Sequence, residues 1–495
     1  MRKRFEVQYE LGATPIEKVK IPTRSRDEIP PVLRALQHIY TTPELNKKVF
    51  DLLEEKITSK IKNDLTTGRP GMTLWEILVF GAVRLSREAN YDHLHFDANH
   101  NSLIRQLVGI SDFGENNKVY PLQTLKDNVS LLDEETLDKI NEVIAQSGHS
   151  LKKNEKLNVK VDTYVLETNV HFPTDINLLW DAGRKCLELI AHIVKDAKED
   201  CLPARAGGSA QAGGWRKHHD WRKRLKAAYH HAAKRTVGAG GRSATGLQAA
   251  TDYLTIANEL SDKIKHTKSI LGGLASGNVA KMSWLCELDY FENQLDKHID
   301  LVRRRLILAQ SIPHEEKVFS LFEPHTEWIK KGKAGNKVEL GLAIAVASDQ
   351  FGFLLGHRIM RKEQDVEIAV PFAKTLVKKY DNIGSISFDK GFWSPSNHQT
   401  ISEIIPFVIM PKKGKLNQDE HEREHAKEFK KLRNAHAAVE SDINSLEHHG
   451  LNRCPDKGLP NFKKYTAFGI LAYNLHRLGN LLREQEQLSK NRKAA

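Results

Sequence analysis

Three acidic residues stand at positions where a carboxylate could do chemistry. Asp162 lies in the middle of an apolar, β-branched run, Asp389 ends a second such run, and Glu440 lies inside a long polar helical pattern. An ionised acid within an apolar strand costs free energy unless a partner compensates its charge. A divalent cation is such a partner, and Mg²⁺ prefers oxygen ligands. Two ions about 3.5–4 Å apart would activate a water and stabilise a leaving oxygen in phosphoryl transfer.

Each of these acids also has an ordinary structural explanation. Asp162 is explained equally well as a hydrogen-bonded acid of a strand. Asp389 precedes Gly391 closely enough to be a turn residue. Glu440 shares its segment with many other charges and fits a solvated helix face. Residue type and spacing alone therefore leave both interpretations open.

The segments that must position these acids alternate between strand and helix patterns. Runs of β-branched and aromatic residues predict five strands, and helical periodicity predicts helices among and after them. The strands are expected at 158–170, 318–322, 338–346 with its continuation 351–359, 385–389 and 404–409, and the helices at 370–380, from Pro395, at 417–449 and at 461–482. Once residues from about 180 to 312 are set aside, this order predicts an α/β fold with a three-layer, RNase-H-like mixed sheet.

Helical patterns dominate the rest of the chain. Thr73, followed three residues later by Glu76, predicts a capping box at the start of an apolar helix. We therefore expect an all-helical N-terminal domain at 1–150 that contacts DNA. The α/β catalytic core is expected at 151–485, interrupted by a large helical, basic insertion at about 180–312, and a polar tail is expected at 486–495.

Positive charge is concentrated in one segment of that insertion. The whole chain has a formal net charge of +12, and residues 203–244 hold ten basic residues and one acid, which gives +9. Trp215, Trp221 and Tyr229 lie among them. Because cations release counterions from a phosphate backbone and aromatic rings stack on bases, one interpretation is a DNA-binding arm. The alternative is a solvated basic loop.

The composition argues against several classes of protein. The four cysteines include no Cys-x-x-Cys pair, which argues against a disulfide scaffold and a structural zinc knuckle. No run approaches about 18 consecutive apolar residues, the length of a membrane-spanning helix. The N-terminus has no apolar core of signal-peptide length. We therefore expect a cytoplasmic protein with no membrane partner.

Three sequence blocks surround the acids. They are Asp162-Thr-Tyr-Val-Leu-Glu-Thr-Asn-Val-His-Phe-Pro-Thr-Asp175, Asp389-Lys-Gly-Phe-Trp-Ser394, and Val439-Glu440 followed by Ile443, Leu446 and Gly450-Leu-Asn-Arg453. These blocks resemble the three motifs of bacterial insertion-sequence transposases with a DDE active site, above all the loosely classified ISNCY group. Trp328–Lys333 and Ala472–Leu475 also match, and the resemblance covers most of residues 72–482.

The resemblance implies metal-dependent DNA cleavage at the ends of an insertion element, followed by strand transfer into target DNA. It implies that Asp162, Asp389 and Glu440 are the catalytic acids and hold two Mg²⁺ ions, for which Mn²⁺ could substitute. Some relatives carry a fixed residue spacing around the glutamate that is absent here, so Glu447 is an alternative third acid. The expected partner is double-stranded DNA, bound by a homodimer in the bacterial nucleoid.

Basic residues near the acids and in the insertion are the candidate phosphate contacts. They are Lys330, Lys331, Lys333, Lys412, Lys413, Arg216, Lys217, Arg222, Lys223 and Arg224. Two other functions fit the same residues. One is a DNA-binding regulator that keeps the fold without catalysis, and the other is an RNase-H-like nuclease that cuts DNA without joining it.

Overall fold

A computed structural model of the 495-residue chain describes residues 4–5, 14–60, 71–87, 90–110, 118–152, 155–197, 215, 218–236, 243–271, 279–330 and 338–494. The chain divides into two units, one made of Met1–Asn169 with Glu327–Ala495 and the other of Val170–Thr326. Asp162, Asp389 and Glu440 all belong to the first unit. The internal geometry of that unit therefore decides whether they meet.

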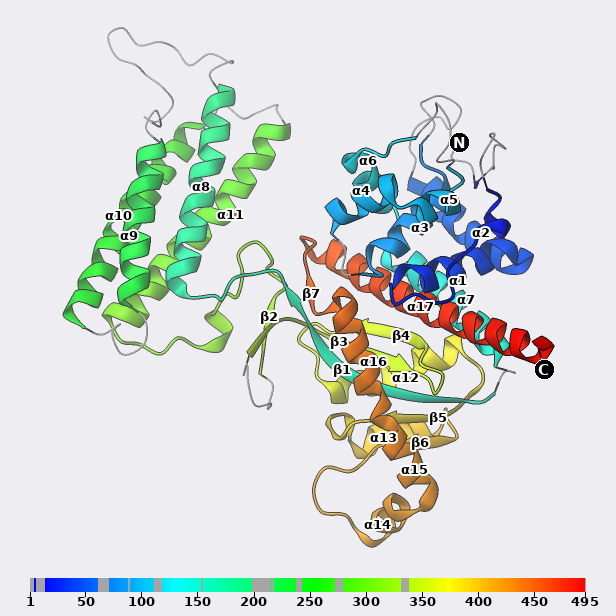
Figure 1. Cartoon of the computed structure of the whole chain (residues 1–495). Helices are drawn as coiled ribbons and strands as arrows, with labels where there is room; N and C mark the ends of the chain where they lie inside the picture. The colour runs from blue at the N-terminus through cyan, green and yellow to red at the C-terminus, as the bar shows by residue number, and fades with distance from the viewer. Residues whose placement is uncertain are drawn as a thin grey trace. The chain divides into compact units, whose positions relative to one another are not determined.

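A mixed β-sheet crosses the first unit (Figure 1). Its main path runs β2 (Glu327–Lys330), β3 (Val338–Ser348), β1 (Leu157–Thr168), β5 (Ile383–Phe388) and β6 (Phe407–Ile409), while β4 (Leu354–Ile359) pairs with β3 and β7 (Arg453–Cys454) pairs with β1. β1 is antiparallel to β3 and parallel to β5, and β5 is parallel to β6. The central strands are largely buried, which explains their nearly continuous apolar sequences. The expectation of a mixed α/β fold is confirmed.

One expected strand, at 318–322, is wrong. This segment has no strand partner, and the short strand β2 begins five residues later, at Glu327. Leu321 is instead buried in the core of the second unit, and the Ser320 hydroxyl accepts a hydrogen bond from the Glu323 N–H at 3.0 Å. Strand preference depends on finding a pairing edge, and these apolar side chains are buried against helices.

In the described part of the chain, seven α-helices precede the sheet. They are α1 (Ile29–Thr41), α2 (Pro43–Lys60), α3 (Leu74–Arg84), α4 (Tyr91–His100), α5 (Ser102–Leu107), α6 (Leu122–Val129) and α7 (Glu134–Leu151). The capping box expected at α3 is confirmed, because Thr73 Oγ1 accepts from the Glu76 N–H at 3.2 Å and Glu76 Oε2 accepts from the Thr73 N–H at 2.7 Å.

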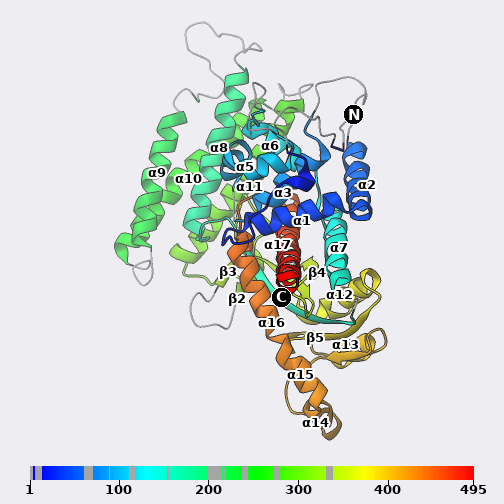
Figure 2. The same ribbon diagram turned by 45° about the vertical axis from the view of Figure 1, so that its right-hand side comes forward.

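These N-terminal helices share one hydrophobic core with the sheet and with the last helix, α17 (Leu459–Ala494). Figures 1 and 2 show α17 alongside α1 and α7. The contact with α1 requires a glycine, because a Cβ at Gly479 would lie 1.8 Å from the Pro31 carbonyl oxygen. Residues 1–150 are thus packed into the unit that carries the acids. The expected tail at 486–495 is helical as far as Ala494.

The helices after β4 include the one that carries Glu440, while Asp389 directly follows β5. These helices are α12 (Asp365–Lys379), α13 (Pro395–Ser402), α14 (Gln418–His425), α15 (Lys427–His436), α16 (Ala438–Leu446) and a π-helical turn at Glu447–Leu451. The single long helix expected at 417–449 is therefore broken. At Ala426 the backbone leaves the helical region, with φ −58° and ψ 140°. The break lets α15 and α16 follow the sheet while α14 turns away (Figure 2).

The second unit is helical and encloses the expected insertion. Its helices are α8 (Asp175–Ala197), α9 (His218–Arg235), α10 (Ala244–Leu271) and α11 (Val279–Val302). Two of the three aromatic residues in the basic segment serve packing here. Trp215 is buried and donates its indole N–H to Thr267 Oγ1 at 2.7 Å, and Tyr229 stacks on Trp180. Neither ring is presented for stacking on a base.

Candidate active site

The two aspartates meet because of strand register. Val161 on β1 pairs with Phe388 on β5, and these strands are parallel neighbours. Asp162 and Asp389 each come one residue later. Register partners project from the same face of a sheet, so both carboxylates emerge on one side at the end of β5.

Glu440 reaches the same face through a set of anchored helical residues. His436 ends α15 and its Nδ1 lies 2.9 Å from the Ser387 hydroxyl on β5. Lys160 on β1 lies 3.5 Å from Asp442 of α16, and the Tyr473 hydroxyl donates to that carboxylate at 3.1 Å. These contacts hold the first turn of α16, where Glu440 lies, against the strand that carries Asp162.

A fourth carboxylate, Asp365, joins the group. It is the first residue of α12, and its charge raises the pKa of Asp162. Gly391 makes room for it, since a Cβ there would lie 2.9 Å from Asp365 Oδ2. No sequence motif marks Asp365. An acid in the first turn of a helix is common because it complements the helix dipole, so the pattern carries no distinct signal.

All four carboxylates line one cleft of about 1000 Å³. The acidic side chains around it are Asp162, Glu327, Glu363, Asp365, Asp389, Glu440 and Glu447. Burial raises the pKa of Asp162 to about 6, and the charges of Asp389, Asp365 and Glu440 act in the same direction. A hydrogen bond from the Thr163 N–H to Asp162 Oδ1, at 2.7 Å, opposes this shift. Like charges are thus concentrated where a cation would relieve their repulsion.

Electrostatic neighbours distinguish Glu440 from its rival Glu447. The charge of Glu440 raises the pKa of Asp162, whereas Glu447 acts on Tyr164, the next β1 residue on that face. Both glutamates line the cleft, but Glu447 lies further along β1. Glu440 is therefore the better placed of the two glutamates to bind a metal ion together with the aspartate pair.

The donor set fits a hard divalent cation, because it consists of carboxylate oxygens on separate elements. Among the described residues, the one group of three potential ligands whose donor atoms all lie within 4.8 Å of one another is elsewhere, at Glu28, His449 and His476. The carboxylates of the cleft are more widely spaced than that.

The candidate phosphate contacts near the acids divide into two kinds. Lys330 and Lys413 are exposed and line the cleft. Lys412 is already engaged, because its Nζ lies 2.7 Å from Glu420 Oε2. Its backbone N–H donates to Glu424 Oε1 at 2.8 Å. Lys331 and Lys333 lie outside the described residues.

The candidate phosphate contacts of the second unit lie on or before α9. Arg222 and Lys223 are exposed, and Arg224 pairs with Glu259 at 3.0 Å and lies over the Trp221 ring. Arg216 and Lys217 lie outside the described residues. Arg222 and Lys223 thus remain exposed candidates for contact with a polyanion.

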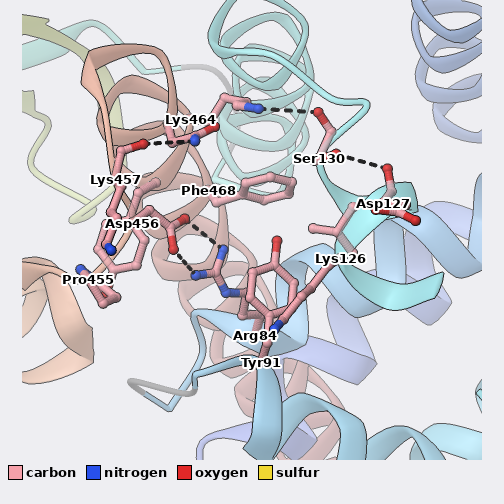
Figure 3. Close-up of a pocket in the computed structure, with 13 residues that line it drawn as sticks. Arg84, Tyr91, Lys126, Asp127, Ser130, Pro455, Asp456, Lys457, Lys464 and Phe468 are labelled. Carbon is pink, nitrogen blue, oxygen red and sulfur yellow. Dashed lines mark hydrogen bonds and ion pairs between the residues drawn. The ribbon is translucent and has the colours of Figure 1, made fainter. Parts of the chain in front are cut away.

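A second pocket in the first unit, of about 370 Å³, does not share this chemistry (Figure 3). A structural ion pair lines this pocket: the buried Arg84 of α3 donates to both carboxylate oxygens of Asp456, at 2.6 and 3.1 Å. Lys464 donates to the Ser130 carbonyl oxygen at 3.3 Å across its rim. The acid-lined cleft is accordingly the candidate active site.

Two wider observations complete the description. Within the described ranges, no helix combines the length and apolar composition that a membrane span needs. Comparisons of the chain with protein-family models, with curated proteins and with solved structures find no match.

Proposed function

We propose that this protein is a transposase of the DDE type, which cuts DNA at the ends of an insertion element and joins those ends to target DNA. One observation carries the proposal: carboxylates from β1, the end of β5, α12 and α16 line a single cleft. Such a set is costly to gather without a cation, because each negative charge destabilises the next. The residues named are those that the family resemblance singles out, with Asp365 in addition.

The strand order supports an RNase-H-like interpretation of the catalytic core. β1, β3 and β4 form an antiparallel set in chain order, after which β5 and β6 add in parallel on the other side of β1. That is the strand order of an RNase-H-like sheet, with the first aspartate on the central strand. The proposal thus draws on topology as well as on the acids.

The side chains of the cleft would divide the work. Two Mg²⁺ ions would be held by Asp162, Asp389 and Glu440, with Asp365 beside them. Such ions would activate a water or a DNA 3′-hydroxyl as the nucleophile and would stabilise the leaving oxygen. Lys330 and Lys413 would bind phosphates of the DNA backbone as point charges. Ser387 and Lys160 would keep α15 and α16 in place through His436 and Asp442.

The experiment is a cleavage and joining assay with purified full-length protein. The substrate is a DNA fragment that carries the coding sequence with its natural flanks, and Mg²⁺ or Mn²⁺ is compared with EDTA. Asp389→Asn is the test variant, and Asp381→Asn, an exposed acid of the same unit, is the matched control. We expect metal-dependent cutting at discrete positions and joined products for the wild type and the control, and neither for Asp389→Asn.

The same assay separates the alternatives. Cutting without joined products supports the nuclease. Sequence-specific binding without cutting, in any of the metals, supports the non-catalytic regulator. Cutting by Asp389→Asn at the wild-type rate would exclude the proposed site, because a carboxamide cannot replace a charged ligand of a metal ion.

A further inference from the structure

A second group of potential metal ligands lies away from the acid cleft. Glu28 directly precedes α1, His449 lies in the π-helical turn that follows α16, and His476 lies on α17. One donor atom from each lies within 4.8 Å of the others. Three segments far apart in the chain thus bring two imidazoles and a carboxylate to one point of the first unit.

Hydrogen bonds orient these side chains. His449 Nδ1 lies 3.0 Å from the Ser86 carbonyl oxygen, so Nδ1 carries the proton and the lone pair of Nε2 faces Glu28. This is the outer contact that metal-binding histidines commonly use to fix their tautomer. His476 Nε2 lies 2.8 Å from Glu28 Oε2, and His449 Nε2 lies 3.9 Å from the same oxygen. A shared proton now occupies the space between His476 and Glu28.

The distances suit a small tetrahedral ion. Zinc binds imidazole nitrogen at about 2.0–2.1 Å, so neighbouring ligand atoms of a tetrahedral site lie roughly 3.4 Å apart. The observed 2.8 and 3.9 Å lie on either side of that value. The side chains of His449, His476 and Glu28 are 15, 26 and 40 % exposed, which leaves one side open to a water as fourth ligand.

The local backbone brings His449 into place. The turn after α16 contains Gly450, whose φ of 95° lies in the left-handed region that glycine adopts without strain. The Tyr465 hydroxyl donates to the Gly450 carbonyl oxygen at 2.8 Å and ties this turn to α17. His449 is therefore held by contacts that exist without any ion.

We propose that Glu28, His449 and His476 form a binding site for one zinc-class divalent cation, which joins the start of α1, the turn after α16 and α17. Two imidazoles and a carboxylate favour zinc, cobalt or nickel over magnesium. The ion displaces the proton between His476 and Glu28, so binding releases a proton. The positive charges of Arg477 and Arg483 act on His476 and oppose a cation at this site.

The test counts metal ions on the full-length protein. The purified protein is stripped with a chelator, dialysed against Zn²⁺, and analysed for bound zinc and, separately, for Co²⁺ absorbance. Wild type and His448→Gln, a substitution of the exposed neighbouring histidine, should bind the same number of ions. His449→Gln and His476→Gln should each bind one ion fewer and lose the intense visible bands of tetrahedral Co²⁺.

Glu28→Gln serves as a second test variant, because Glu28 precedes α1 and its side chain is the most exposed of the three. It should weaken Zn²⁺ binding at least tenfold while circular dichroism stays unchanged. Equal zinc content in wild type, His449→Gln and His476→Gln would overturn the proposal, as would Co²⁺ spectra without tetrahedral bands. The site does not depend on the acid cleft, so Asp389→Asn should retain the intense visible bands of tetrahedral Co²⁺.

Discussion

Asp162 and Asp389 each follow one member of the Val161–Phe388 pair, the last register pair between the parallel strands β1 and β5. They are 389 − 162 = 227 residues apart in the sequence. The second unit accounts for most of this separation in sequence. The pairing of β1 with β5 brings the two residues next to each other in space. The functional proposal depends on this register, because a shift by one residue would turn one carboxylate to the opposite face.

The raised pKa of Asp162 predicts a gain in stability on its removal. The carboxyl titrates near pH 6 in the folded protein and near 3.8 in its unperturbed state. Protonated Asp162 therefore favours the folded state at low pH, and this contribution is lost as the pH rises through about 6. Asp162→Asn should raise the free energy of unfolding by about 1–3 kcal/mol at pH 7–8, since one pKa unit is about 1.36 kcal/mol and water reaches part of the side chain.

Urea unfolding in EDTA checks this prediction between pH 5 and 8. The difference between Asp162→Asn and wild type should shrink towards pH 5, and Asp381→Asn should show no such trend. Adding millimolar Mg²⁺ should stabilise the wild type more than Asp162→Asn. A variant less stable than wild type at pH 8 in EDTA would contradict the electrostatic description of the cleft.

Glu440 and Glu447 can be separated by matched substitutions. Glu440→Gln should reduce metal-dependent cleavage by a factor of about 10³ or more, because it removes a charged ligand beside the aspartates. Glu447→Gln should reduce cleavage by less than about tenfold, since its charge acts on Tyr164 whereas that of Glu440 acts on Asp162. Single-turnover cleavage rates measure both, with the exposed Glu422→Gln as control. The reverse order of effects would transfer the role to Glu447.

Asp365 is expected to matter for catalysis although no motif marks it. Asp365→Asn should lower the cleavage rate by about 10- to 100-fold and shift the pKa of Asp162 downward, since one neighbouring negative charge is gone. Gly391→Ala should produce a smaller loss, because its Cβ would press on Asp365 Oδ2. The pH dependence of single-turnover rates provides the readout. Wild-type rates for Asp365→Asn would remove this residue from the site.

Lys413 and Lys412 are adjacent in sequence and differ in their contacts, which makes them a matched pair. Lys413→Ala should weaken DNA binding about 3- to 10-fold and reduce the slope of log affinity against log salt concentration by about one. Lys412→Ala should leave that slope nearly unchanged, because the Lys412 ammonium is already paired with Glu420. Fluorescence anisotropy over a salt series measures both. Equal slopes for the two variants would argue against a phosphate contact at Lys413.

The sequence alone was sufficient for features that depend on local pattern. The β-branched and aromatic run around Asp162 predicts a strand, and β1 spans Leu157–Thr168. Most side chains of this strand are buried, on both faces of the sheet. The capping box joins Thr73 to Glu76, three residues later, and needs no contact with a distant part of the chain. Both follow from steric and hydrogen-bonding rules that act within a few residues.

Only the tertiary structure decided which side chains meet. The segment at 318–322 has the composition of a strand, yet it contributes Leu321 to a helical core. Trp215 lies in the basic segment, where the sequence allowed a ring that stacks on a base, but its side chain is buried. Asp365 joins the acids, and Glu28 joins His449 and His476, across distances in sequence that no spacing rule covers. The reason is physical: the interaction energy of two charges falls with the inverse of their distance in space, and a metal site needs its ligand atoms at fixed short distances. The sheet register and the breaks between α14, α15 and α16 set those distances.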